Sequence, residues 1–206
     1  MMKLYYAKGT CALASHIALE EAGAEYSTVR LNFAAQEQRS PEYLSINPKG
    51  RVPTLITERG TLTETPAMLA FIAQTYPEAQ LAPLHDPFRF AEVQAFNSYL
   101  CSTVHVAHAH RLRGTRWADE PAAIESMKRK VPETMAACFD MIESKMLRAP
   151  WVMGETYTIC DPYLFTIAQW LAGDGVDPAR FPKVNAHLGQ MSARTAVRKV
   201  LAEQTG

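Results

Sequence analysis

The chain has 206 residues, and its length and composition predict an ordinary globular protein. Hydrophobic residues make up 48% of it and charged residues 20%, which excludes an intrinsically disordered chain. The 21 acidic and 21 basic residues balance, so the charge favours neither nucleic acid nor an anionic membrane as a partner. The chain start lacks the apolar core of a signal peptide, and no apolar run reaches transmembrane length. We therefore expect a soluble cytoplasmic protein.

The first eighty residues predict alternating strands and helices. Short β-branched or aromatic runs bounded by turn residues indicate strands, and longer apolar-periodic runs indicate helices. In chain order we expect strands at 3–6, 26–30, 52–56 and 61–63, and helices at about 12–23, 41–46 and 65–76. The helix at 65–76 has Thr65 as its expected N-cap and Pro66 at its first position. The order is βαβαββα.

Beyond the prolines at 83 and 87 the sequence predicts helices and no strand. Three- and four-residue spacing of apolar side chains predicts one long helix through 90–107 and a second through 124–146, kinked at Pro132. Two more helices are expected at about 159–172 and 183–203, the last of them broken or continuous. The fold class is therefore an α/β domain at 1–80, a linker at 81–87 and an all-helical domain at 88–206.

Four cysteines stand far apart, at positions 11, 101, 138 and 160, without a C-x-x-C pair. This spacing predicts neither a structural disulfide nor a zinc site. Cys101, His105 and His108 share helical spacing, but no fourth ligand stands nearby, so we expect no metal. Cys138 and Cys160 fit small buried residues.

Cys11 has an electrostatic reason to react. It follows a strand and the Gly9 turn and would stand at a helix N-terminus, where unpaired N–H groups favour an anion. We therefore expect its thiol to ionise more easily than a free one. It could act as a nucleophile, recognise a thiol ligand, or be an inert packed residue. His16, about one turn later, is expected to be a hydrogen-bonded packing residue.

Thr158 and Asp161 fit a capping box at the start of the helix that follows them. The Thr158 hydroxyl can satisfy the Asp161 N–H, while the carboxylate returns to the Thr158 N–H. We expect this pair to matter for the folding of the helical domain and not for chemistry.

Three motifs together resemble the glutathione S-transferase family, and specifically its bacterial beta class. They are K-L-Y-Y-x-x-G-x-C-A-L-A-S-H at 3–16, N-P-K-G-R-V-P-T-L at 47–55 and T-I-C-D-P-Y-L at 158–164. The resemblance covers essentially the whole chain. It implies a thioredoxin-like domain followed by a helical domain, glutathione as co-substrate, and assembly as a homodimer.

The resemblance also implies residue roles in the first domain. Cys11 would face the sulfur of glutathione, and Arg51 would be a further glutathione-binding residue. The Val52-Pro53 bond would be cis, and the Val52 N–H and C=O would pair with glutathione as an added strand. A tight turn with a trans proline and no ligand is the alternative.

Glutathione would also contact the start of the helix after the fourth strand and the long helix of the second domain. Glu64 would pair with the ligand ammonium, and Thr65 with the γ-glutamyl carboxylate, in addition to capping. His105 would donate a hydrogen bond to the ligand sulfur or tune Cys11; the alternative is a solvated histidine in a cluster with His108 and His110.

Two lysines typical of the beta class are missing. The loop at 33–38 holds no lysine, and Val106 follows His105. Either glutathione binds more weakly, or Arg51, Arg111 or Arg113 supplies the charge.

Three functions follow. The leading one is conjugation of the glutathione thiol to small, largely apolar electrophiles, as in detoxification. The second is a monothiol thiol-disulfide oxidoreductase acting through Cys11. The third is a non-catalytic ligand-binding protein, which the missing lysines favour.

Overall fold

A four-stranded mixed sheet forms the centre of the N-terminal domain. The computed structural model describes residues 1–205, so Gly206, the end of the predicted second domain, lies outside the described residues. The sheet has the order β2-β1-β3-β4, with β2 parallel to β1 and the other two pairs antiparallel. The strands are β1 (Met2–Tyr6), β2 (Tyr26–Arg30), β3 (Thr54–Thr57) and β4 (Gly60–Thr63).

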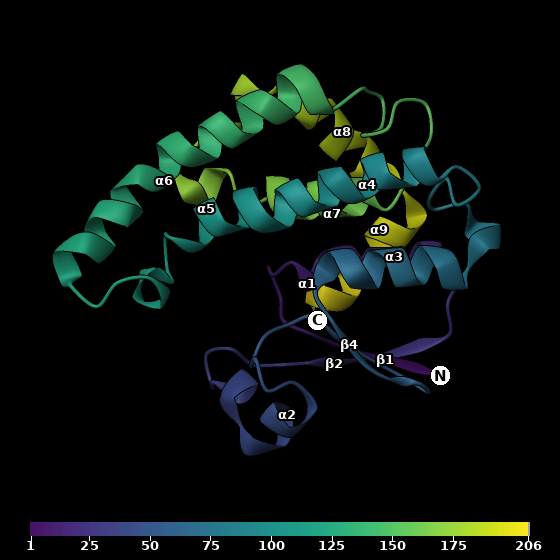
Figure 1. Ribbon diagram of the computed structural model, residues 1–206, viewed down its shortest axis with the longest axis horizontal. Helices are drawn as coiled ribbons and strands as arrows, with labels where there is room; N and C mark the ends of the chain where they lie inside the picture. Colours follow the sequence, from purple (N-terminus) through teal and green to yellow (C-terminus); the bar gives the residue numbers. More distant parts are fainter. Residues whose placement is uncertain (206) are drawn as a thin grey trace.

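Helices α1 (Ala12–Glu21) and α3 (Thr65–Thr75) lie between this sheet and the helical domain, and α2 (Pro41–Ile46) lies on the far side of the sheet (Figure 1). Because α1 also packs against α7 and α9 of the helical domain, every residue from Ala12 to Leu19 is buried. A thioredoxin-like domain therefore shares its core with the all-helical domain that follows it.

The C-terminal domain consists of helices joined by turns and loops, among them the loop at 147–159. Its α-helices are α4 (Pro87–Tyr99), α5 (His105–Ala109), α6 (Pro121–Met141), α7 (Cys160–Ala168), α8 (Pro182–Ala193) and α9 (Thr195–Thr205). Two π-helical turns, η3 (Leu100–Val104) and η5 (Ile142–Met146), continue α4 and α6. Short 3₁₀ turns of this domain are η4 (Gly114–Arg116), η6 (Ala172–Asp174) and η7 (Pro178–Arg180), and those of the N-terminal domain are η1 (Glu37–Arg39) and η2 (Pro77–Ala79). Within the described residues, no helix is both long and apolar enough to span a membrane.

The sequence predicted the element order correctly and several boundaries wrongly. The βαβαββα order of the first domain is confirmed. The third strand begins at Thr54 and not at Val52, since Pro53 has no N–H to give to a ladder. The segment predicted as one long helix through 90–107 contains a π-helical turn, and the helix expected at 159–172 ends at Ala168. The last helical segment is broken at Arg194, whose backbone is extended. The predicted linker at 81–87 stays a prediction.

Asp161 is the centre of a buried polar network at the start of α7. Its Oδ2 accepts from the Thr158 N–H at 2.7 Å, as expected of a capping box. The other half of the box is wrong: the Thr158 hydroxyl accepts from the Cys160 N–H at 3.3 Å, because the Asp161 N–H donates to the Thr158 carbonyl. Its Oδ1 accepts from the Val152 N–H at 2.8 Å and lies 3.0 Å from His187 Nε2.

Candidate functional site

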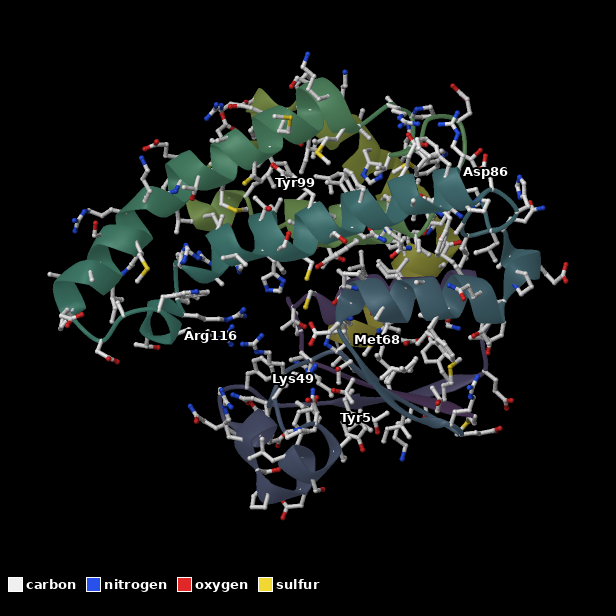
Figure 2. The ribbon with its side chains drawn as sticks, in the orientation of Figure 1. Tyr5, Lys49, Met68, Asp86, Tyr99 and Arg116 are labelled. Carbon is white, nitrogen blue, oxygen red and sulfur yellow. The ribbon has the colours of Figure 1, made fainter. Side chains whose placement is uncertain are left out.

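A pocket lies between the two domains. Its lining includes the predicted catalytic and glutathione-binding residues Cys11, Arg51, Val52, Pro53, Glu64, Thr65 and His105, but not Arg111 or Arg113. Figure 2 shows Lys49, another lining residue, on the N-terminal domain, and Arg116 on the part of the helical domain that faces it. The fold thus brings together in this pocket residues that are up to about a hundred positions apart in sequence.

Cys11 immediately precedes α1 on the floor of this pocket. Its side chain is nearly buried, and its Sγ donates to the Val52 carbonyl oxygen at 3.5 Å. Burial raises the pKa of the Cys11 thiol. Hydrogen bonding with Thr65 and the charge of Arg113 lower this pKa, but by less than burial raises it. The expectation of an easily ionised thiol is therefore wrong, because desolvation outweighs the helix N-terminus. Cys11 is a neutral hydrogen-bond donor in this pocket.

Side-chain hydrogen bonds fix the backbone of the loop that carries Val52. The Val52-Pro53 bond is cis, as the resemblance implies. The Tyr43 hydroxyl and the Asn47 amide donate to the Arg51 carbonyl at 2.6 and 2.8 Å. Within the described residues no hydrogen bond uses the Val52 N–H. That edge is open to an extended ligand.

Glu64 and Thr65 mark the start of α3. Glu64 is the N-cap residue, so the prediction that Thr65 caps the helix is wrong by one position. The backbone of Glu64 has a φ of 71°, an unfavourable conformation for a residue with a side chain, of the kind that concentrates at ligand sites. Its carboxylate lies 2.5 Å from the Lys49 ammonium, whereas Thr65 is buried on the pocket wall. The Glu64 carboxylate is thus held in place at the pocket, and Lys49 is already its ion-pair partner.

His105 is the first residue of α5, directly after the π-helical turn η3. Its Nε2 lies 3.4 Å from Arg113 Nη1, and its ring makes an edge contact with Trp170 at 5.0 Å. Burial and the neighbouring charges of Arg113, His108, Arg116 and Arg51 lower the pKa of His105 to about 3. His105 is therefore a neutral imidazole at physiological pH.

The low pKa of His105 predicts a loss of stability in mild acid. Between a pKa of about 3 in the folded chain and an ordinary value near 6.5, the unfolded chain binds the extra proton, so stability falls as the pH falls. From pH 7.5 to 5.0 this group alone should remove about 2 kcal/mol from the free energy of unfolding. In urea unfolding, the free energy of unfolding of His105→Gln should therefore fall by about 2 kcal/mol less between these pH values than that of the wild type. His85→Gln, at an exposed position, is the control; equal acid sensitivity of wild type and His105→Gln would contradict the prediction.

A second hollow, here called the cleft, adjoins the pocket and shares Cys11, Arg51, Val52, His105 and Arg116 with it. Arg39, Arg51, Arg113 and Arg116 line this cleft, and no aspartate or glutamate among the described residues does. None of the four forms an ion pair with another described residue. Burial, followed by Arg51, Arg113 and Arg39, lowers the pKa of Arg116, as expected of like charges held together.

Of the three arginines expected to replace the missing lysines, Arg111 is occupied elsewhere. Its Nε lies 3.0 Å from Asp174 Oδ1, and it also donates to the Gly173 carbonyl. Arg116 takes its place at the cleft, although no motif in the sequence pointed to it. The available signal was the basic run at 111–116, which has no acidic residue until Asp119.

Cys101, Trp170 and Tyr163 were also missed as residues of this site. Cys101 and Trp170 lie outside the three motifs, and Tyr163 lies in the third motif, which predicted only a structural role. Cys101 enters the pocket from the π-helical turn η3, and Tyr163 from α7. The Trp170 indole donates to the Gly9 carbonyl at 3.1 Å and stacks on His108 at 4.1 Å, which holds the turn before Cys11. These contacts depend on the packing of the two domains.

The remaining candidates have structural surroundings. His16 is buried, with Gln204 Nε2 3.3 Å from its Nδ1 and Glu203 3.2 Å from its Nε2, which confirms a packing role. Over the described part of the chain, no group of three or more His, Cys, Asp or Glu side chains could hold a metal ion.

The fold and the site define a two-domain protein of the thioredoxin-fold class with a thiol-lined pocket between its domains. Residues 1–74 match the family model of the glutathione S-transferase N-terminal domain. A glutathione transferase homologue from Sulfitobacter, solved with bound glutathione, is 49% identical, with a TM-score of 0.96 and 98% of each chain covered. The beta-class glutathione S-transferase of Sphingomonas chungbukensis is 30% identical, with a TM-score of 0.85 and 98% of each chain covered. Glutathione S-transferase GstA of Escherichia coli O157:H7 is 29% identical over 206 residues, 98% of each chain. The chain belongs to the glutathione S-transferase family, a family of transferases.

Proposed function

We propose that this enzyme binds glutathione in the pocket between its domains and conjugates the glutathione sulfur to small electrophiles with a largely apolar body. The observation that carries the proposal is a cleft with four arginines and no carboxylate among its described lining residues, around a neutral Cys11 and a neutral His105. Such surroundings favour an anion supplied by the ligand, here the thiolate of glutathione.

In this proposal the protein holds glutathione at three points. The γ-glutamyl carboxylate meets Thr65 at the start of α3, where the helix dipole also favours it. The open Val52 N–H and the Val52 carbonyl pair with the backbone of the ligand cysteine. The glycyl carboxylate then lies at the opposite end of the ligand from Thr65, on the side of Arg39 and Arg51.

Cys11 acts as a donor and not as a nucleophile in this proposal. Without a ligand, the Cys11 S–H donates to the Val52 carbonyl oxygen. When a ligand N–H donates to that oxygen instead, the Cys11 S–H is released and turns toward the ligand sulfur. The glutathione thiol loses its proton to solvent, its sulfur forms the bond to the electrophilic carbon, and the leaving group departs with its electron pair. Arg113 and the neutral His105 stabilise the thiolate before this step.

The test is conjugation of glutathione to chlorodinitrobenzene by wild type, Cys11→Ala and Cys11→Ser. We expect turnover by the wild type and a loss of no more than roughly tenfold in kcat/KM in both variants, the size expected for one weak hydrogen bond. No turnover of any activated haloaromatic would contradict the proposal. Glutathione binding without turnover would favour the non-catalytic alternative.

The thiol-disulfide alternative makes the opposite prediction for the same variants. Reduction of a glutathione mixed disulfide through Cys11 needs the Cys11 thiolate, which the high pKa opposes. We expect wild type to reduce such a substrate slowly. Fast reduction that Cys11→Ala abolishes, beside weak conjugation, would make the oxidoreductase the better description.

Assembly as a homodimer, a cytoplasmic location and a role in detoxification belong to the same proposal and are supported by the family resemblance. Light scattering during size-exclusion chromatography tests the first of these. A mass near twice the 22.9 kDa of the chain is the expected result.

A further inference from the structure

The cleft carries more positive charge than glutathione alone can balance. Four guanidinium groups line it. If glutathione binds as proposed, its γ-glutamyl carboxylate lies outside the cleft, at Thr65, which is a lining residue of the pocket only. The glycyl carboxylate and the thiolate then balance two of the four charges. Arg39 and Arg51 share the glycyl carboxylate in this arrangement, so the cleft keeps two positive charges in excess.

The positions of the arginines indicate which of them has no glutathione group to pair with. Arg39 and Arg51 lie on the N-terminal domain, which holds glutathione. Arg113 is the arginine whose charge acts on the Cys11 thiol, and it contacts His105, so it serves the thiolate. Arg116, in η4 of the helical domain, lines both the pocket and the cleft and has no carboxylate partner among the described residues.

An apolar rim accompanies Arg116. Trp117 lines the pocket and is 47% exposed, and Leu112 lines the cleft and is 75% exposed. Large exposed apolar side chains beside an unpaired guanidinium fit a ligand with a flat apolar body and one negative charge.

We propose that the electrophile is an organic anion, an aromatic or unsaturated carboxylate, whose charge pairs with Arg116 while its apolar body lies against Trp117 and Leu112. This inference rests on the proposed conjugation and narrows its substrate class. With an activated chloroaromatic acid as the substrate, the glutathione sulfur forms the bond to the ring carbon. Chloride departs with the electron pair of the broken bond, the thiol proton goes to solvent, and the carboxylate is unchanged.

The test compares para-chloro-meta-nitrobenzoate with its methyl ester, which lacks the negative charge and carries one additional methyl group. Each kcat/KM is divided by the uncatalysed rate constant with glutathione, because the ester is intrinsically more reactive. We expect the wild type to prefer the carboxylate by roughly tenfold or more, and Arg116→Gln to reduce that preference to about threefold or less. Arg59→Gln, on the exposed β3-β4 turn, removes the same charge elsewhere and should keep the preference. A wild type without preference, or a preference that survives Arg116→Gln, would overturn the inference.

A binding measurement separates this inference from the proposed function. Calorimetry with the inert anion meta-nitrobenzoate, in the presence of S-methylglutathione, needs no turnover. We expect Arg116→Gln to weaken its binding by roughly tenfold and Arg59→Gln to leave it unchanged. Binding that depends on Arg116 without turnover of any electrophile would refute the conjugation alone. Turnover of the ester with no Arg116-dependent anion binding would refute the anionic substrate alone.

Discussion

Replacing Thr65 with valine should weaken glutathione binding by about 10- to 100-fold, the cost of one hydrogen bond to a charged group. Thr65 is buried on the pocket wall at the first position of α3. Valine keeps the shape and removes the hydroxyl, so the γ-glutamyl carboxylate would lose a donor where water cannot replace it.

Isothermal calorimetry with glutathione measures this loss. Thr65→Ser keeps the hydroxyl and is the matched control, with an affinity expected within a few-fold of the wild type. Thermal unfolding of all three proteins shows whether α3 remains folded. Equal affinity in a folded Thr65→Val variant would mean that glutathione does not use the start of α3.

Replacing Asp161 with alanine should lower the free energy of unfolding by about 3–5 kcal/mol, as expected when one partner of a buried charged network is removed. The carboxylate is fully buried and accepts from the N–H groups of Val152 and Thr158. His187, which is also buried, lies 3.0 Å from it. Alanine would leave these groups without a partner at the start of the central helix α7.

Urea unfolding followed by circular dichroism gives this free energy. Asp119→Ala, which removes an exposed carboxylate, is the control and should change the free energy by less than about 0.5 kcal/mol. Should Asp161→Ala fail to fold, Asp161→Asn keeps the shape and part of the network and should give a smaller loss. A loss below about 1 kcal/mol for Asp161→Ala would contradict the account of this network.

Local sequence signals were enough to predict the first domain. Hydrophobic periodicity and turn residues indicated the order of strands and helices, and the second strand and the helix at Pro41–Ile46 match to the residue. The π-helical turns were not predictable, because apolar spacing alone does not separate them from α-helix. The consequence is functional: one of these turns precedes His105 and brings Cys101 into the pocket.

The candidate site was predictable where motifs carry it and not where the packing of the domains creates it. Cys11, Val52 and Thr65 stand in or directly after the strand and turn patterns of the first domain, and one pocket contains them all. The ionisation of Cys11 was predicted wrongly, because the helix N-terminus is visible in the sequence but its desolvation is not. Arg116 and Trp170 reach the site only through tertiary packing.

The central claim is that the site between the domains binds glutathione as a thiolate beside a protonated Cys11. Ultraviolet absorbance of the thiolate, titrated against pH with glutathione bound to wild type and to Cys11→Ala, tests it most directly. We predict that binding lowers the pKa of the glutathione thiol by roughly one unit or more from the ordinary value near 8.5, and that the thiolate signal persists in Cys11→Ala. A bound thiol that titrates like free glutathione, or a thiolate signal that belongs to Cys11 and disappears with it, would contradict the account.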